Sequence, residues 1–317
     1  QGFTALFVGE PKYEEAPGTE DYYSEKRSAD ALNAALDKIA GFRAAGKGVK
    51  LDKVKNIARS LLDRFSQSPE NMHRFLDIRR KEEYIFAHSV NTCFLSVMTG
   101  LALGYDSEQL NELALAAMLH DIGKLKFSRH LASQFPRYLT LAEKEEYKQH
   151  TYYALEILRE NKNLSVNIIN ACFQHHERWN GRGYPMGIKG DSISEYAQII
   201  GIADVYDRLI TGLPHRAPTP VYYASAILNM AAGEYFNPAL VEKFNQSIVT
   251  YLMGKTVRLN NGQSGVILGV GLKNKNTPTI RISSNYDGTP ANQLIELDLS
   301  KNPEFFIIDF EEISPQA

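Results

Sequence analysis

The stretch HHERWNGRGYP, residues 175–185, decides how this chain is interpreted. It places two adjacent histidines at the end of an apolar run, followed by glycines, a lone tryptophan and a Tyr-Pro pair. The chain has only 8 histidines in 317 residues, so two side by side are unusual. Buried polar groups are tolerated only when they satisfy one another or a cation, and the pair therefore needs partners.

Such partners stand in apolar, helix-like segments elsewhere in the chain: His88, His120, Asp121, His150 and Asp204. Each lies on or at the end of a predicted helix with apolar neighbours, which directs its side chain toward a helical core. Any one alone is more simply a satisfied core histidine or a helix-terminal carboxylate. With His175 and His176 they supply five imidazoles and two carboxylates, a ligand set suited to two first-row transition metals.

The composition is that of a globular protein without a strong charge bias, with 44% hydrophobic residues and a net charge of -2. This balance argues against a binder of nucleic acid polymers or membrane surfaces, while a small anionic ligand still fits. Cys93 and Cys172 lie in apolar helical patterns, which favours buried thiols in a reducing compartment. No apolar run is long enough to span a bilayer, so a cytoplasmic protein is expected.

The apolar spacing predicts a mainly α protein in three parts. Residues 1–70 are expected to form a mostly helical N-terminal region of unknown role, and residues 71–253 a helical domain. Residues 254–317 are expected to form a small β-rich appendix of three to five strands, with a hairpin at the Asn-Gly pair of VRLNNGQSGVILGV. Capping patterns predict helix starts at Ser107, at Thr140 with Glu143, and at Ser192 with Glu195.

The motifs HDIGK (120–124), HHERWNGRGYP (175–185) and IADVYDRL (202–209) follow one another along the chain, with His150 between the first two. In this order they resemble the HD-GYP subfamily of HD-domain metal phosphohydrolases. The resemblance runs from about residue 80 to residue 245 and does not explain residues 1–70. It implies a helical HD-domain bundle that holds divalent iron or manganese and hydrolyses the second messenger cyclic di-GMP or a related cyclic dinucleotide.

The resemblance also implies roles for single residues. One metal ion is expected among His88, His120, Asp121 and Asp204. The other is expected among His150, His175 and His176, with Asp121 as the bridge. Lys124 matches the motif lysine beside the scissile phosphate, so Lys124 and Asp121 are the expected catalytic residues. The expected substrate-binding residues are Tyr184, Arg182 and Arg216.

Three departures from the family pattern bear on the function. Members with a third metal carry a glutamate one turn before the first histidine, where this chain has Tyr84, which predicts two ions, with iron as the first choice. Downstream of Asp204 the chain reads LPHR, so Leu213 and His215 replace the usual arginine and tyrosine. The stretch after HDIGK lacks the usual Lys-Pro-Gly segment. An intact metal site with an altered substrate edge, and hence weak activity, is expected.

Three functions follow as alternatives. The first is a metal-dependent phosphodiesterase of cyclic di-GMP or a related cyclic dinucleotide. The second is a non-hydrolytic receptor or interaction module that keeps the metal core and engages a partner protein through the GYP loop. The third is a phosphohydrolase of nucleotide monoesters, because a fold alone does not determine a substrate. Two questions stay open: Arg178 and Arg182 are either cleft cations or surface residues, and Trp179 either stacks on a base or packs the loop.

Overall fold

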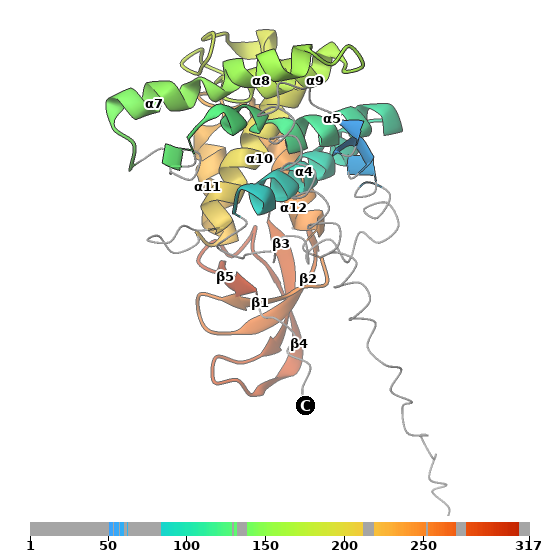
Figure 1. Cartoon of the computed structure of the whole chain (residues 1–317). Helices are drawn as coiled ribbons and strands as arrows, with labels where there is room; N and C mark the ends of the chain where they lie inside the picture. Colours follow the sequence, from blue (N-terminus) through green and yellow to red (C-terminus); the bar gives the residue numbers. More distant parts are fainter. Residues whose placement is uncertain are drawn as a thin grey trace, which may run out of the picture.

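The computed structural model describes residues 51–52, 54–56, 58–59, 62, 84–128, 130–131, 138–211, 219–251, 253–270 and 277–310. These residues form a bundle of α-helices with a small antiparallel sheet at one end (Figure 1). The predicted mainly α fold with a small C-terminal β appendix is therefore confirmed. Among the helices in these ranges, none combines the length and the apolar character needed to cross a bilayer.

Two long helices form the centre of the bundle, α4 (Tyr84–Leu103) and α10 (Glu195–Thr211). Every residue from His88 to Val97 on α4 is buried, so this helix needs neighbours on all sides. Those neighbours are α10, α5 (Ser107–Leu119) and α12 (Pro238–Tyr251). In turn α10 packs against α9 (Val166–Gln174) and α11 (Val221–Ala231). Polar residues on α4 and α10 are therefore held in the interior.

The helix starts agree only in part with the capping patterns. Thr140 and Glu143 form the predicted capping box at the start of α7 (Leu141–Lys148). Ser107 is not the cap of α5, because Asp106 one residue earlier accepts hydrogen bonds from the backbone N–H groups of Glu108 and Gln109. The carboxylate satisfies two orphan donors at once, which leaves Ser107 as the first helical residue.

Two further boundaries differ from the expectation. The helix predicted to run from Thr140 through His150 is two helices, because α7 ends at Lys148 and α8 (His150–Arg159) begins after Gln149. The predicted Ser192–Glu195 capping box is wrong: Ser192 lies in a short 3-10 turn, η5 (Gly190–Ser192), and α10 begins at Glu195 itself. A capping box needs the glutamate at the third helical position, which Glu195 does not occupy.

The C-terminal appendix is a five-stranded antiparallel sheet with the strand order β4-β3-β2-β1-β5. Its strands are β1 (Thr256–Leu259), β2 (Ser264–Val270), β3 (Pro278–Ser284), β4 (Pro290–Asp298) and β5 (Ile307–Phe310). The predicted hairpin joins β1 to β2, with Gly262 at a φ of 86° in the turn. The sheet contacts α12 through β2 and α11 through β5, so it rests on the end of the bundle.

Part of the predicted N-terminal region contributes to the main core. The described residues between 51 and 62 form helical turns, and their buried side chains, Leu51, Val54, Ala58 and Leu62, belong to the same apolar cluster as the bundle. The short strand considered for residues 2–8 and the helix predicted for residues 29–45 lie outside the described residues. The three-part division of the chain stays a prediction.

Candidate metal centre

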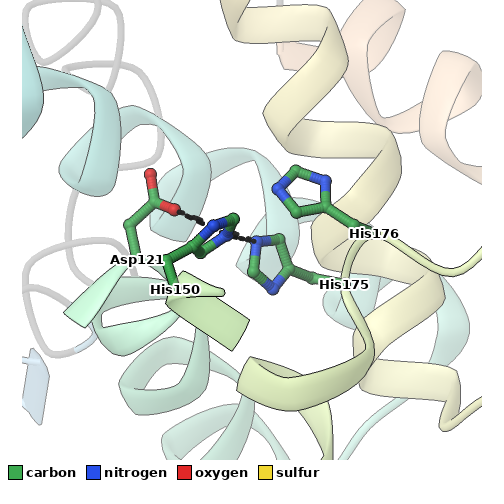
Figure 2. A group of neighbouring side chains, drawn as sticks. All are labelled: Asp121, His150, His175 and His176. Carbon is green, nitrogen blue, oxygen red and sulfur yellow. Dashed lines mark hydrogen bonds and ion pairs between the residues drawn. The ribbon is translucent and has the colours of Figure 1, made fainter. Parts of the chain in front are cut away.

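The seven histidines and aspartates singled out in the sequence converge inside the bundle. Ligand atoms of one group lie within 4.8 Å of one another, and this group is Asp121, His150, His175 and His176 (Figure 2). A second group under the same limit is His88, His120 and Asp121. Asp121 belongs to both, and Oδ1 of Asp204 lies 2.9 Å from Nε2 of His88. All seven are buried, so the cluster is an internal feature of the fold.

Most of these residues lie at the ends of helices. His120 follows α5, Asp121 precedes the 3-10 turn η3 (Ile122–Lys126), and His150 begins α8. His175 and His176 follow α9 directly. Helix ends allow adjacent residues to point in different directions, which brings both members of the His-Asp and His-His pairs to one place.

Two glycines allow the backbone segments of the site to approach closely. A Cβ atom on Gly123 would lie 1.8 Å from the carbonyl oxygen of His150, so only glycine lets η3 press against the start of α8. On α10, a Cβ on Gly201 would lie 2.7 Å from the carbonyl oxygen of His175. The glycine of HDIGK therefore positions Asp121 against His150.

Backbone carbonyls set the tautomers of three histidines. Nδ1 of His120 lies 2.7 Å from the oxygen of Ala117, Nδ1 of His150 lies 2.6 Å from that of Tyr147, and Nδ1 of His175 lies 2.8 Å from that of Cys172. Because a carbonyl oxygen only accepts, each Nδ1 carries the proton and each Nε2 keeps a lone pair. Nε2 of His150 and Nε2 of His175 are only 3.4 Å apart. Two lone pairs at this distance are best accommodated by a cation.

At Asp121, His150, His175 and His176 the electrostatics favour neutral imidazoles and an ionised carboxylate. Burial lowers the pKa of His150 to about 4 and holds the pKa values of His175 and His176 well below the usual range. Burial alone would raise the pKa of Asp121, but the charge of Lys124 and the neighbouring His120 hold it well below its usual value. Neutral imidazole and ionised carboxylate are the forms in which these groups bind a metal ion.

The residues present fit a divalent cation by a further criterion. Nε2 of His120, Nε2 of His176 and Oδ1 of Asp121 are buried and make no hydrogen bond within the described part of the chain. A buried polar atom without such a bond costs about 1–3 kcal/mol, and three in one cluster are hard to explain by folding alone. A cation bound to these atoms removes that cost. The cluster is therefore suited to binding divalent metal.

Sequence reasoning missed the carboxylate that orients His88. Oδ2 of Asp207 lies 2.7 Å from Nδ1 of His88, while its Oδ1 accepts hydrogen bonds from Asn91 at 2.8 Å and Thr211 at 3.0 Å. Burial acts to lower the pKa of His88, but its hydrogen bonds to Asp204 and Asp207 outweigh this and raise the pKa to about 9. A carboxylate on the far nitrogen is the usual partner of a ligating histidine. Its only signal in the sequence was a second aspartate within the apolar run of α10.

Glu177, also missed, shapes the GYP loop. It is buried, and its Oε1 accepts hydrogen bonds from the backbone N–H groups of Met186 at 2.7 Å and Gly187 at 3.1 Å. The loop also folds back through a 3.1 Å bond from the Tyr184 N–H to the His176 carbonyl. As a result the Tyr184 ring lies 4.6 Å from the His176 ring, and the predicted substrate-cleft tyrosine does lie against the cluster.

Lys124 lies beside the bridging carboxylate. Its Nζ bonds Oδ2 of Asp121 and lies 5.0 Å from the centre of the Tyr147 ring. Burial acts to lower the pKa of Lys124, but the negative charge of Asp121 outweighs it and the pKa is raised. The ammonium therefore stays charged at neutral pH, at the edge of the cluster.

The remaining predicted residues are placed differently. Arg178 is half-buried and donates to the carbonyls of His175 and Glu177, so it braces the loop. Arg182 is exposed, and its guanidinium makes no ion pair within the described ranges. Trp179 lines a small hollow whose lining contains none of the seven cluster residues. Some predicted features lie outside the described residues: Leu213, His215, Arg216 and the side chain of Tyr84.

A helical bundle that gathers five histidines and two aspartates in its interior is suited to binding divalent metal ions. A family model described as "HD domain" matches residues 71–240. The chain belongs to the HD-domain family, and its ordered motifs place it in the HD-GYP subfamily.

Three known proteins illustrate the similarity. The "Cyclic di-GMP phosphodiesterase PA4108" of Pseudomonas aeruginosa is 29% identical over 77% of this chain and 59% of its own length. The "3'3'-cGAMP-specific phosphodiesterase 3" of Vibrio cholerae is 33% identical over 47% of this chain and 32% of its own length. A solved structure, described as "Bd1817, a HDG"Y"P protein from Bdellovibrio bacteriovorus", shares the fold with a TM-score of 0.61. It is 19% identical, over 74% of this chain and 75% of that chain. The chain thus spans less than two thirds of the curated relatives' length.

Proposed function

We propose that this protein is a metal-dependent phosphodiesterase that hydrolyses cyclic di-GMP or a related cyclic dinucleotide at a centre of two divalent ions, with iron as the first choice. The observation that carries the proposal is the pair of ligand groups that share Asp121. A carboxylate common to two groups of imidazoles suits a dinuclear centre, because its two oxygens can each bind one ion. The cyclic dinucleotide class is supported by the names of the relatives.

The proposed ligands divide between two ions. One ion is assigned to His88, His120, Asp121 and Asp204, and the other to Asp121, His150, His175 and His176. When bound, such a pair of ions supplies a water of lowered pKa near a phosphodiester whose charge the ions neutralise. The carbonyl partners of His120, His150 and His175 keep each Nε2 unprotonated, and Asp207 holds His88. The protein thus orients the ligands in advance.

Lys124 and Tyr184 are proposed to act on the substrate. The charged Nζ of Lys124 is held at Asp121 and can donate to a phosphoryl oxygen or to the departing oxygen as negative charge develops. We infer that the Tyr184 ring, which packs on His176, forms one wall of the path by which a substrate reaches the cluster. A preformed wall limits how a cyclic dinucleotide can approach the ions.

The test is metal analysis of protein purified without oxygen, combined with hydrolysis assays of cyclic di-GMP, 3'3'-cGAMP and the linear dinucleotide pGpG. We expect two ions per chain and turnover of at least one cyclic substrate with Fe(II) or Mn(II). Release of inorganic phosphate from pGpG, without turnover of either cyclic substrate, would favour a monoesterase. Binding of a cyclic dinucleotide by fully loaded protein without any turnover would refute the enzyme and favour a receptor.

A further inference from the structure

Arg208 lies on α10 one helical turn after Asp204 and reaches the carboxylates of both proposed ion sites. Its Nε is 2.8 Å from Oδ1 of Asp204, and its Nη2 is 4.0 Å from Oδ2 of Asp121. The two aspartates come from different elements, α10 and the start of η3. The guanidinium therefore spans the cluster from one carboxylate toward the other.

The exposure of these side chains shows on which side of the cluster Arg208 lies. The Arg208 side chain is 27% exposed, whereas those of Asp121 and Asp204 are 4% and 1% exposed. Arg208 therefore extends from the buried carboxylates toward solvent. This is a side from which an anionic substrate can approach the carboxylates.

Lys124 and Tyr184 are within electrostatic reach of the same guanidinium. Burial raises the pKa of Tyr184 well above its usual value, and the charge of Arg208 opposes that rise. Burial and the charge of Arg208 both act to lower the pKa of Lys124, but the negative charge of Asp121 outweighs them and the pKa is raised. Lys124 on η3 and Arg208 on α10 approach the same oxygen, Oδ2 of Asp121, while Tyr184 of the GYP loop lies against His176.

We propose that Arg208 binds the phosphodiester of the substrate, an inference that rests on the proposed function. A guanidinium is permanently charged, and its planar donors match the oxygens of a phosphate. Arg208 donates hydrogen bonds to the two nonbridging oxygens, which leaves Lys124 to the departing oxygen. No bond is formed or broken by Arg208 itself.

This role changes the expectation drawn from Leu213. The sequence lacks an arginine at the position where the family commonly carries one, which predicted weak substrate binding. Arg208 supplies a guanidinium from α10, at a place that the contacts with Asp121 and Asp204 define. The cluster therefore retains an arginine for phosphate despite the altered LPHR segment.

The test compares variants of the metal-loaded full chain. Arg208→Gln keeps a side-chain donor for Asp204 without the charge, and Arg208→Lys keeps the charge without the planar fork. Arg159→Gln, on the exposed end of α8, is the matched control. For each protein we would measure the metal content, the affinity for inorganic phosphate by calorimetry, and kcat and KM for cyclic di-GMP.

We expect Arg208→Gln to retain its metal and to bind phosphate about 10- to 150-fold more weakly, with at least as large a fall in kcat/KM. Arg208→Lys should lose less, and the control nothing. Phosphate affinity within twofold of the unmodified protein would overturn the proposal. The proposal would also be overturned if Arg208→Gln lost phosphate binding only to the extent that it lost metal. Arg208 would then position Asp204 and would not bind the phosphate itself.

The outcomes separate this inference from the proposed function. If the unmodified protein binds phosphate through Arg208 but hydrolyses no cyclic dinucleotide, the proposed function fails and the Arg208 site stands. If the unmodified protein hydrolyses cyclic di-GMP and Arg208→Gln does so equally well, the function stands and the Arg208 site fails.

Discussion

Asp207→Asn is the most informative single change, because Asp207 is buried and lies outside the proposed ligand set. Its Oδ2 accepts the proton of His88 Nδ1, and its Oδ1 accepts from Asn91 and Thr211. Asparagine has the same shape but only one accepting oxygen. If its NH₂ faces His88, the imidazole must move its proton to Nε2, where it blocks a metal ion. If its NH₂ faces the other side, it meets the two donors Asn91 and Thr211.

The magnitude follows from the bond that is lost. A charge-assisted hydrogen bond contributes about 1.5–3 kcal/mol, which corresponds to about 10- to 150-fold in an equilibrium constant. Loss of the orienting partner of a metal-binding histidine typically costs about 10- to 100-fold in affinity. The ion assigned to His88 should therefore bind about 10- to 100-fold more weakly to the Asp207→Asn variant. Asp207 is not a member of the group of Asp121, His150, His175 and His176, which should therefore keep its ion.

The assay is a competition titration with a chelator, followed by metal analysis. Asp207→Asn should reach about one tightly held ion per chain where the unmodified protein holds two. Thr211→Val is the matched control, because it removes one of the bonds to Asp207 and leaves the carboxylate in place. Two ions held as tightly as in the unmodified protein would refute the orienting role of Asp207. Loss of both ions would show that the two sites are not separable in this way.

Three further predictions concern the same centre. Asp121→Ala should empty both sites and abolish hydrolysis, whereas His150→Ala should empty mainly one; an unchanged metal content in Asp121→Ala would refute the bridge. Gly123→Ala should lower the free energy of unfolding by about 1–3 kcal/mol, measured with urea, because the added Cβ would meet the His150 carbonyl at 1.8 Å. Chelator-treated protein should lose stability as the pH falls from 7 to 5. Burial lowers the pKa of His150 from 6.5 to about 4, so the unfolded chain binds more protons in this window. Between pH 7 and pH 5, His150 alone should lower the free energy of unfolding by about 2 kcal/mol. His88, whose pKa is raised to about 9, should restore less than about 1 kcal/mol of that loss. Denaturant titrations at both pH values measure this, and a rise in stability toward pH 5 would contradict it.

Local patterns in the sequence predicted the helices, the hairpin and the residue types of the metal centre. Helical periodicity and an Asn-Gly turn act over a few residues, so they are readable without the fold. The helix boundaries were less accurate. Asp106 and Ser107 are both residue types that favour a helix start, so the sequence did not decide between them. At the break between α7 and α8, the carbonyl of Tyr147 accepts a hydrogen bond from the His150 ring, a contact that the residue pattern did not indicate.

Tertiary packing decided what surrounds the seven predicted residues. His88 and Asp207 are separated by 119 positions and meet only because α4 packs against α10. The reach of Arg208 to Asp121 likewise depends on how η3 lies in the bundle. A histidine or an aspartate can be recognised as a ligand type from its residue chemistry alone. Its partner, its tautomer and its pKa depend on groups brought within a few ångströms by the folded chain, and no local pattern encodes that distance.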